Sequence, residues 1–373
     1  MKRDSHYYAT LAFCRACGFK KESAHLVAYA SQFVDDAKIN TIFFNKDLTH
    51  TNLEHDNIEG RPAFLNSATC HSYFRMDTFN YESMVRNTSA FHFVPGCKGE
   101  SFTKKLRCKE ESPVILDIVN EAILEDDLIK LGIVLHVYVD TFSHQGFSGV
   151  LSKVNAIRDC EAKKDEFLDF LDRFLKLFKF FTRERYDMYL DHLLPAYGHA
   201  QAVDLPDLPY MKWSYKYDDS EEFHGSYKYV EVNNKERYRR AFTGIKRYLE
   251  DYLKKHEQYH DKNLFFQSFE ILFETLIFEG SDKAREKNWI DLYIREGLFD
   301  KKDIDLIVYE EDKWLKDAFS NYDQNLFNNR EVEGVQLASH FWYSNWYHFY
   351  LAVKWYKKRF FQTCAKYQLW IPH

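Results

Sequence analysis

Residues 131–147 read LGIVLHVYVDTFSHQGF, and this apolar stretch carries polar side chains at a regular spacing. His136, Asp140 and His144 stand four residues apart, and the stretch contains no lysine, arginine or glutamate. On an α-helix each step of four residues advances roughly 400°, so the three side chains form one narrow stripe on one face. The apolar neighbours indicate that this face is buried. Because a buried carboxylate is costly unless it is paired or coordinated, the stripe predicts a partner, and a divalent metal ion is the best candidate.

The composition of the chain predicts a mainly helical protein. Of its 373 residues only 13 are glycine and 7 are proline, while aromatic residues make up 18%. Few helix breakers and many bulky apolar side chains favour helices packed around a large core. We therefore expect an all-α fold. Residues 1–230 would form a metal-binding helical domain and residues 231–373 a helical extension packed on it, or the two would form one continuous domain.

Local signals place the helices along the chain. Ser112 and Pro113 are typical of a helix start, and we expect the stripe helix to begin after the acidic residues 125–127 and to end near Gly146. Residues 37–112 lack a sustained period and indicate long loops with short helices or a hairpin. Further helices are expected within the first 35 residues and over about 162–194, 235–256, 262–279, 284–320 (with interruptions) and 334–362.

Charge, cysteine content and the chain start bear on the cellular setting. A formal net charge of -6 gives no reason to expect duplex nucleic acid as a partner. Seven scattered cysteines fit a reducing compartment, and Cys14 and Cys17 are more typical of helix packing than of half a zinc site. The first residues, MKRDSHYYAT, are not followed by an apolar signal segment, and no run is long enough to span a membrane. We expect a soluble, cytoplasmic protein, with a non-standard route of secretion left open.

The last predicted helix, 334–362, is rich in tryptophan and tyrosine and continues into Lys357, Lys358 and Arg359. Aromatic residues beside basic ones suit the headgroup depth of a membrane, which would mean peripheral membrane contact. A core helix with a basic exposed end explains the same pattern and is the interpretation that we favour.

Other segments offer the same ligand types as the stripe, in settings that indicate burial. They are Asp4 and His6 near the start, Asp35 and Asp36 at the end of the run AYASQFVDD, His92 in FHFVPG, and His199 in YGHAQAVD. Zinc prefers imidazole and carboxylate ligands, and catalytic zinc sites keep one position for water. Each of these residues by itself is more typical of a core residue or a helix cap. Together with the stripe they predict a larger cluster.

The motif LHVYVDTFSH resembles the central helix of zinc-dependent phospholipase C enzymes and the related single-strand-specific nucleases. His6, Asp35 or Asp36, His92 and His199 match further positions of that pattern. The runs DSHYY, ASQFVDD, LHVYVDTFSHQGF and GHAQAVDLPDLPYMKWSY look still more like an uncharacterised microbial family that is distantly related to those enzymes. The resemblance covers about the first 215 residues. It implies a helical bundle around a metal cluster, here with additional C-terminal helices.

The resemblance also implies a set of ligands for two or three zinc ions. One ion would take Asp35 or Asp36 together with His92, His136 and Asp140, and a second would take His6 and share Asp140. A third would take His144, His199 and Asp204, and Asp4 would replace a ligand that those enzymes draw from their N-terminal residue. The expected function is metal-dependent hydrolysis of a phosphoester, either a small molecule or a lipid, by activated water with Asp35 or Asp36 as general base. The alternative is a non-catalytic binding or effector protein that is braced by the metal.

Overall fold

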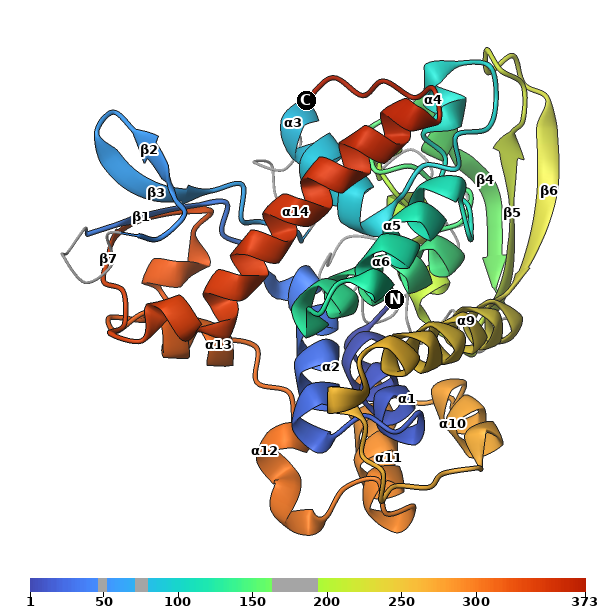
Figure 1. Cartoon of the computed structure of the whole chain (residues 1–373). Helices are drawn as coiled ribbons and strands as arrows, with labels where there is room; N and C mark the ends of the chain where they lie inside the picture. Colours follow the sequence, from blue (N-terminus) through green and yellow to red (C-terminus); the bar gives the residue numbers. More distant parts are fainter. Residues whose placement is uncertain (46–51, 71–79, 163–193) are drawn as a thin grey trace.

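The computed structural model describes residues 1–45, 52–70, 80–162 and 194–373 and shows a mixed α/β fold (Figure 1). The prediction of an all-α protein is therefore wrong, because two β-sheets accompany the helices. The helix predicted over 162–194 lies almost entirely outside the described residues. The hairpin allowed for in residues 37–112 is present.

The longer helices of the described residues carry most of the core. They are α1 (Thr10–Ala16), α2 (Lys21–Asp36), α5 (Pro113–Leu124), α6 (Leu128–Ser143), α9 (Asn234–Lys255), α10 (Phe269–Leu276), α11 (Asp282–Arg295) and α14 (Asn345–Lys366). The short ones are α3 (Tyr81–Ser83), α4 (Phe102–Lys105), α12 (Ile304–Ile307) and α13 (Lys313–Ala318). Helix α5 begins at its predicted Ser112 cap, whose side chain accepts a hydrogen bond from the Ile115 amide.

Helix α6, which carries the stripe, runs through the middle of the molecule (Figure 1). Its partner on the stripe side is α2, and Gly132 sits where the two helices meet. A Cβ atom on Gly132 would lie 2.4 Å from the Val27 carbonyl oxygen. Because Gly132 precedes His136 by four residues, it lies on the stripe face. The missing side chain therefore lets α2 approach close to the stripe.

A four-stranded sheet joins residues from opposite ends of the chain. Its strand order is β2 (Asp56–Ile58), β3 (Arg61–Leu65), β1 (Thr41–Phe44) and β7 (Glu331–Val335). Strands β2 and β3 form a hairpin whose turn residues Glu59 and Gly60 both have positive φ. Strand β1 pairs in parallel with β7, so a strand of the first predicted domain is bonded to one of the second.

A three-stranded antiparallel sheet has the order β4 (Ile157–Ala162), β5 (Lys212–Asp218) and β6 (Tyr227–Asn233) and lies at one edge of the molecule (Figure 1). Strand β5 reads KWSYKYD, and Trp213 stacks on Tyr215 with ring centroids 5.0 Å apart. Aromatic residues at every second position are the period of a strand with one face buried. This alternation was present in the sequence and is the signal that an all-α interpretation missed.

One large core includes buried residues from Met1 to Ile371 and so spans both predicted domains. In α14 the aromatic side chains Trp346, Tyr350 and Tyr356 are buried in this core, as the core interpretation of that helix expected. Lys357 was expected at an exposed basic end but is buried, and its ammonium group donates to the Asn66 and Ala68 carbonyl oxygens. No helix of the described residues is both long and apolar enough to cross a membrane. Peripheral membrane contact stays a prediction.

Candidate metal centre

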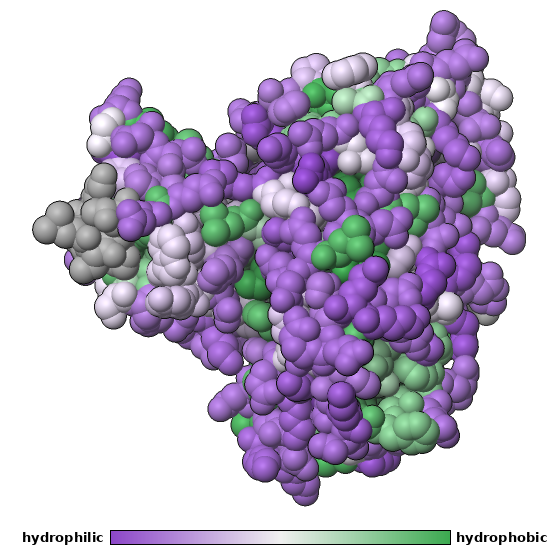
Figure 2. Space-filling model, in the orientation of Figure 1, coloured by the Kyte–Doolittle hydropathy of each residue, from purple (hydrophilic) through white to green (hydrophobic). Residues whose placement is uncertain are grey.

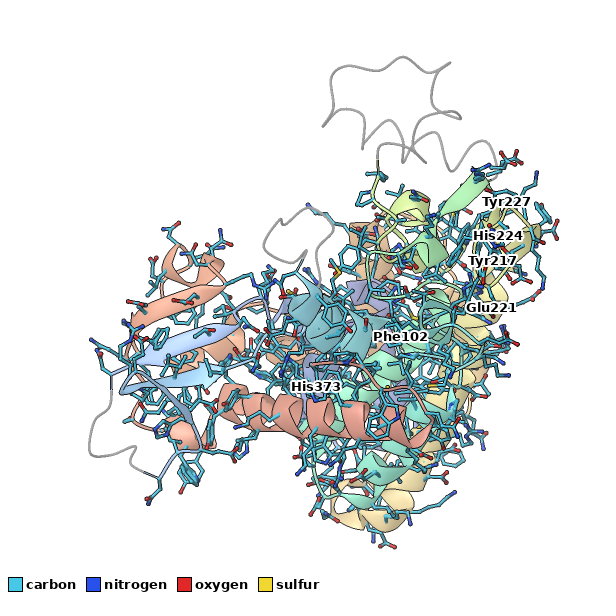
Figure 3. All side chains as sticks on the ribbon, turned by 90° about the horizontal axis from the view of Figure 1, so that it is seen from above. Phe102, Tyr217, Glu221, His224, Tyr227 and His373 are labelled. Carbon is cyan, nitrogen blue, oxygen red and sulfur yellow. The ribbon has the colours of Figure 1, made fainter. Side chains whose placement is uncertain are left out.

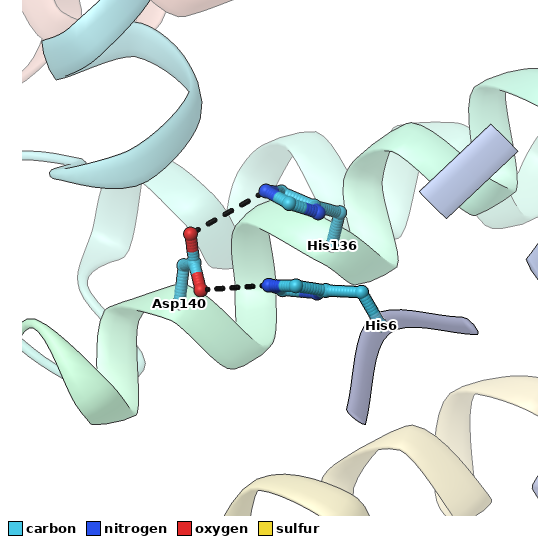
Figure 4. Close-up of side chains that lie close together, drawn as sticks. All are labelled: His6, His136 and Asp140. Carbon is cyan, nitrogen blue, oxygen red and sulfur yellow. Dashed lines mark ion pairs between the residues drawn. The ribbon is translucent and has the colours of Figure 1, made fainter. Parts of the chain in front are cut away.

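Asp140 lies at the centre of a cluster of imidazoles (Figure 4). Its Oδ1 atom is 3.1 Å from Nε2 of His6, and its Oδ2 atom is 3.4 Å from Nε2 of His136. The His6 and His136 rings are stacked, with centroids 3.8 Å apart. Oδ2 of Asp140 also lies 3.1 Å from Nδ1 of His92. His6, His136 and Asp140 form a group whose ligand atoms all lie within 4.8 Å of one another.

A second group joins Asp35 of α2 to His92 and His136, which are ligand candidates on other segments. Oδ1 of Asp35 lies 3.8 Å from Nδ1 of His92 and 3.8 Å from Nε2 of His136. Its Oδ2 atom lies 3.9 Å from Nε2 of His6. The close approach of α2 at Gly132 is what brings Asp35 to the stripe. His136 belongs to both groups, so they form one continuous centre.

A third group consists of His144, His199 and Asp207. Nε2 of His144 lies 3.1 Å from Oδ1 of Asp207, and Nε2 of His199 lies 3.4 Å from its Oδ2 atom. Nδ1 of His144 is 3.6 Å from Asp140 Oδ2, which connects this group to the first two. The stripe of α6 thus borders all three groups.

Two π-helical segments deliver ligand candidates to the centre. His6 lies in η1 (Asp4–Ala9), and His92 is the last residue of η4 (Met84–His92). The π-helix is rare and is frequently found at functional sites. This local geometry gives independent support for a functional role of the cluster.

Backbone carbonyl groups orient three of the imidazoles. Nε2 of His92 lies 3.0 Å from the Thr69 oxygen, Nδ1 of His144 2.6 Å from the His92 oxygen, and Nδ1 of His199 2.7 Å from the Val203 oxygen. A carbonyl oxygen only accepts, so each of these nitrogens carries a proton. The other nitrogen of each ring faces the cluster. This arrangement is the usual second layer around metal-binding histidines.

Burial favours the neutral form of four of the imidazoles. It lowers the pKa of His6, His92 and His136, and it lowers the pKa of His199 to about 4. Lone pairs of the neutral His92 and His199 rings therefore face oxygens of Asp140 and Asp207, at 3.1 Å and 3.4 Å. The Nδ1 atom of His6 has no hydrogen-bond partner within the described ranges. A cation between these acceptors would satisfy them, so the residues fit a metal ion with nitrogen and oxygen ligands.

The carboxylates of the centre differ in their electrostatics. Burial raises the pKa of Asp35 to about 7, although His92 lowers it, and the Asp140 charge raises it further. Burial alone would raise the pKa of Asp140 as well, but His144 and the Met1 nitrogen hold it well below its usual range. Asp140 is 1% exposed, whereas Asp35 is 27% exposed and Asp207 is 14% exposed. Asp35 and Asp207 thus mark the sides from which the centre is accessible.

Three carboxylates predicted as ligands lie outside these groups. Asp4 forms a buried ion pair with Arg285, and Asp36 accepts hydrogen bonds from Tyr309 and Gln32. Asp204 pairs with Lys2 at 3.0 Å. Asp36 follows Asp35 directly, and consecutive helical residues point about 100° apart, so only one of the two can face the stripe. The Met1 nitrogen, 2.7 Å from Asp140 and 3.2 Å from Asp207, lies where Asp4 had been expected.

Asp207 is the ligand candidate that the sequence interpretation missed. It ends the 3₁₀ turn η8 (Leu205–Asp207), whose Pro206 sets the direction of the loop. Val203, just before this turn, has a φ of 50°, which is strained for a β-branched residue. In this conformation the Val203 carbonyl oxygen lies 2.7 Å from Nδ1 of His199 and accepts its hydrogen bond. The segment DLPD contains two carboxylates, Asp204 and Asp207, and no local sequence signal indicates which of them is the ligand.

Comparison with known proteins assigns the chain to a family. It matches the model of a family of unknown function (DUF6765) over residues 1–364, and it belongs to that family. No curated protein and no solved structure matches it. No named relative therefore supports the resemblance to phospholipase C and nuclease proteins.

Proposed function

We propose that this member of a family of unknown function is a metal-dependent hydrolase that acts on phosphoesters. The observation that carries the proposal is the convergence of buried imidazoles on Asp35, Asp140 and Asp207 in one centre. Such a donor set favours zinc among the common divalent ions. The resemblance of the motif LHVYVDTFSH to phospholipase C and nuclease proteins supports the phosphoester as substrate class.

Each group of ligand candidates would hold a metal ion. His6, His136 and Asp140 would hold one ion, Asp35 and His92 would complete a neighbouring position with His136, and His144, His199 and Asp207 would hold another. Metal ions in such positions lower the pKa of bound water and neutralise charge on a phosphoryl oxygen.

Asp35 is the candidate for proton transfer. Its pKa of about 7 suits a group that accepts a proton near neutral pH, and its partial exposure allows contact with a substrate. Asp36, the other predicted base, is held by Tyr309 and does not reach the centre.

A second candidate function is a metal-braced binding protein without catalysis. It is favoured by the burial of the imidazoles, since His6, His92, His136, His144 and His199 are each at most 2% exposed. A structural metal site is closed, whereas a catalytic one keeps an open position. The exposure of Asp35 and Asp207 favours the catalytic function.

Elemental analysis of full-length protein purified without chelator tests the proposal, together with hydrolysis of a phosphodiester reporter and a short-chain phospholipid. We expect two or more zinc ions per chain, and activity that is lost in Asp140→Asn. Asp117→Asn is the control, because Asp117 pairs with Lys366 at the surface. Metal without any hydrolysis, and melting of His136→Ala, would favour the structural brace. A protein with no bound metal would refute both functions.

A further inference from the structure

A cavity bordered by charged side chains lies beside the metal centre and shares none of its ligand candidates. Its volume is about 360 Å³, and it is lined by the loop 96–109, the end of the stripe segment at Gln145 and Gly146, strand β5 and helix α9. Cys108 lines it and donates a weak hydrogen bond from Sγ to the Thr141 carbonyl oxygen of α6. The cavity and the metal centre therefore lie against the same helix end.

The lining of this cavity is strongly cationic in a protein whose net charge is negative. Five basic side chains border it, which are Lys98, Lys104, Arg107, Lys109 and Arg237, against the two carboxylates Asp219 and Glu221. Glu221 accepts hydrogen bonds from the Glu100 and Ser101 amides, so its charge is already engaged. Figure 3 shows Glu221 and Tyr217 at the same edge of the molecule.

Among these cations, Arg237 gives the strongest indication of an anion site. It is 8% exposed, and in the part of the chain that the structure describes it forms no ion pair. Its one hydrogen bond runs from Nη1 to the Ser143 carbonyl oxygen at 3.3 Å. The carboxylate that acts on it electrostatically, Glu110, is bound to Arg240 at 2.6 Å. A buried guanidinium with so little compensation is costly, and an anion in the cavity would relieve that cost.

The ion pair of Arg107 is also weak. The contact between Arg107 Nη1 and Asp219 is 3.9 Å long, and the Arg107 Nε atom is buried without a hydrogen-bond partner within the described residues. Burial and the nearby Arg107 charge lower the pKa of Lys104, and contact with Lys98 lowers the pKa of Lys109. Like charges have been gathered here at an energetic cost, as in sites that bind a multiply charged anion.

We infer that this cavity binds a phosphoryl group, as free phosphate or as a small phosphate monoester, at a site separate from the metal centre. Two guanidinium groups supply planar donors that match phosphate oxygens, and the lysines add point charges at the rim. The cavity is larger than a single oxyanion needs, so it also has room for a small organic group. The inference does not depend on the proposed hydrolase activity.

Calorimetric titration of the full chain tests this site, with inorganic phosphate and separately with glycerol phosphate, at an ionic strength held constant with sodium chloride. A chelator keeps the metal centre from contributing. We expect saturable binding of one phosphate per chain that is weakened at least about ten-fold in Arg237→Gln, because a charge-assisted hydrogen bond is lost. Arg239→Gln is the matched control, since Arg239 lies on the same helix and pairs with Glu270 at the surface. If inorganic phosphate binds more tightly than glycerol phosphate, the ligand is free phosphate, and the reverse order identifies a phosphate monoester.

Lys98→Met provides a test that folding cannot confound, because Lys98 is an exposed residue at the rim. We expect phosphate binding several-fold weaker than in the unchanged protein, with an unchanged circular dichroism spectrum. Absence of saturable binding in the presence of chelator would overturn the inference. Equal binding by the unchanged protein, Arg237→Gln and Lys98→Met would overturn it as well. Neither result would bear on hydrolysis, which is read from the Asp140→Asn comparison.

Discussion

Nδ1 of His92 lies 3.1 Å from Oδ2 of Asp140, and this contact joins a π-helical segment to the stripe helix. The His92 proton is placed on Nε2 by the Thr69 carbonyl oxygen, so the two facing atoms are both acceptors in the neutral ring. Burial lowers the pKa of His92 and opposes a second proton on that ring. A metal ion between the two atoms would remove the repulsion between these two acceptors.

Asp207→Asn should remove metal from the third group, whereas Asp204→Asn should not. Asp207 contacts His144 and His199, but Asp204 contacts Lys2 and is 40% exposed. We expect metal affinity at that group to fall on the order of 100-fold in Asp207→Asn, a loss typical of disturbed metal sites. The zinc content of both variants after dialysis measures this. Equal zinc contents would contradict the assignment of Asp207.

Gly132→Ala should destabilise the protein and weaken metal binding together. The new Cβ atom would lie 2.4 Å from the Val27 oxygen and 2.7 Å from the Ala30 Cβ, so helices α2 and α6 must separate. We expect a loss of about 1–3 kcal/mol in the free energy of unfolding, as for other overpacked cores. Separation also moves Asp35 away from His136.

Urea unfolding and zinc content measure these two effects. Gly280→Ala is the control, because its closest neighbour is the movable Phe278 ring at 3.1 Å. If Gly132→Ala matched this control in both measurements, the close approach of the two helices would not be needed for the centre.

Val203→Gly should stabilise the protein without loss of metal. Val203 has φ 50° and ψ -126°, a conformation that is open to glycine and costs other residues about 1–3 kcal/mol. The half-buried valine side chain offsets part of this gain, so we expect a rise of about 1 kcal/mol in the free energy of unfolding. Urea unfolding of metal-loaded protein checks it. A fall in stability would show that the side chain contributes more than the strain costs.

Metal binding should release a proton near pH 6 and weaken as the pH falls below 7. The pKa of Asp35 is raised to about 7 by burial and by the Asp140 charge, so metal-free protein holds this proton at pH 6. A carboxylate ligand must be ionised, and metal therefore displaces the proton. The buried imidazoles, whose pKa values are lowered, are already neutral at this pH.

Calorimetry in buffers of different ionisation enthalpy counts the released protons, and Asp35→Asn should release fewer. The stability of the metal-free protein changes with pH in the opposite direction. A carboxyl group with a raised pKa binds more protons folded than unfolded, so its contribution falls as the pH rises from about 4 to 7. Proton release that is equal in Asp35→Asn would place the titrating group elsewhere.

Local patterns predicted the helices well where their signals are strong. Helix α5 begins at Pro113 as expected, and α9 spans 234–255 against the predicted 235–256. Apart from the hairpin allowed for in residues 37–112, the strands were missed. Strands β1 and β7 are short, and they gain stability from pairing with each other across the length of the chain. A window of sequence around Thr41 holds no information about Glu331, its partner in the sheet.

The sequence by itself determined the stripe, because the spacing of His136, Asp140 and His144 and their apolar surroundings follow from helix periodicity alone. Only the tertiary structure decided which distant carboxylates meet it. Asp35 and Asp207 face the stripe, whereas Asp36 and Asp204 do not. Neighbouring residues of the same chemistry differ only in the direction in which they point. That direction is set by the packing of α2 at Gly132 and by the strained turn at Val203, neither of which any local pattern records.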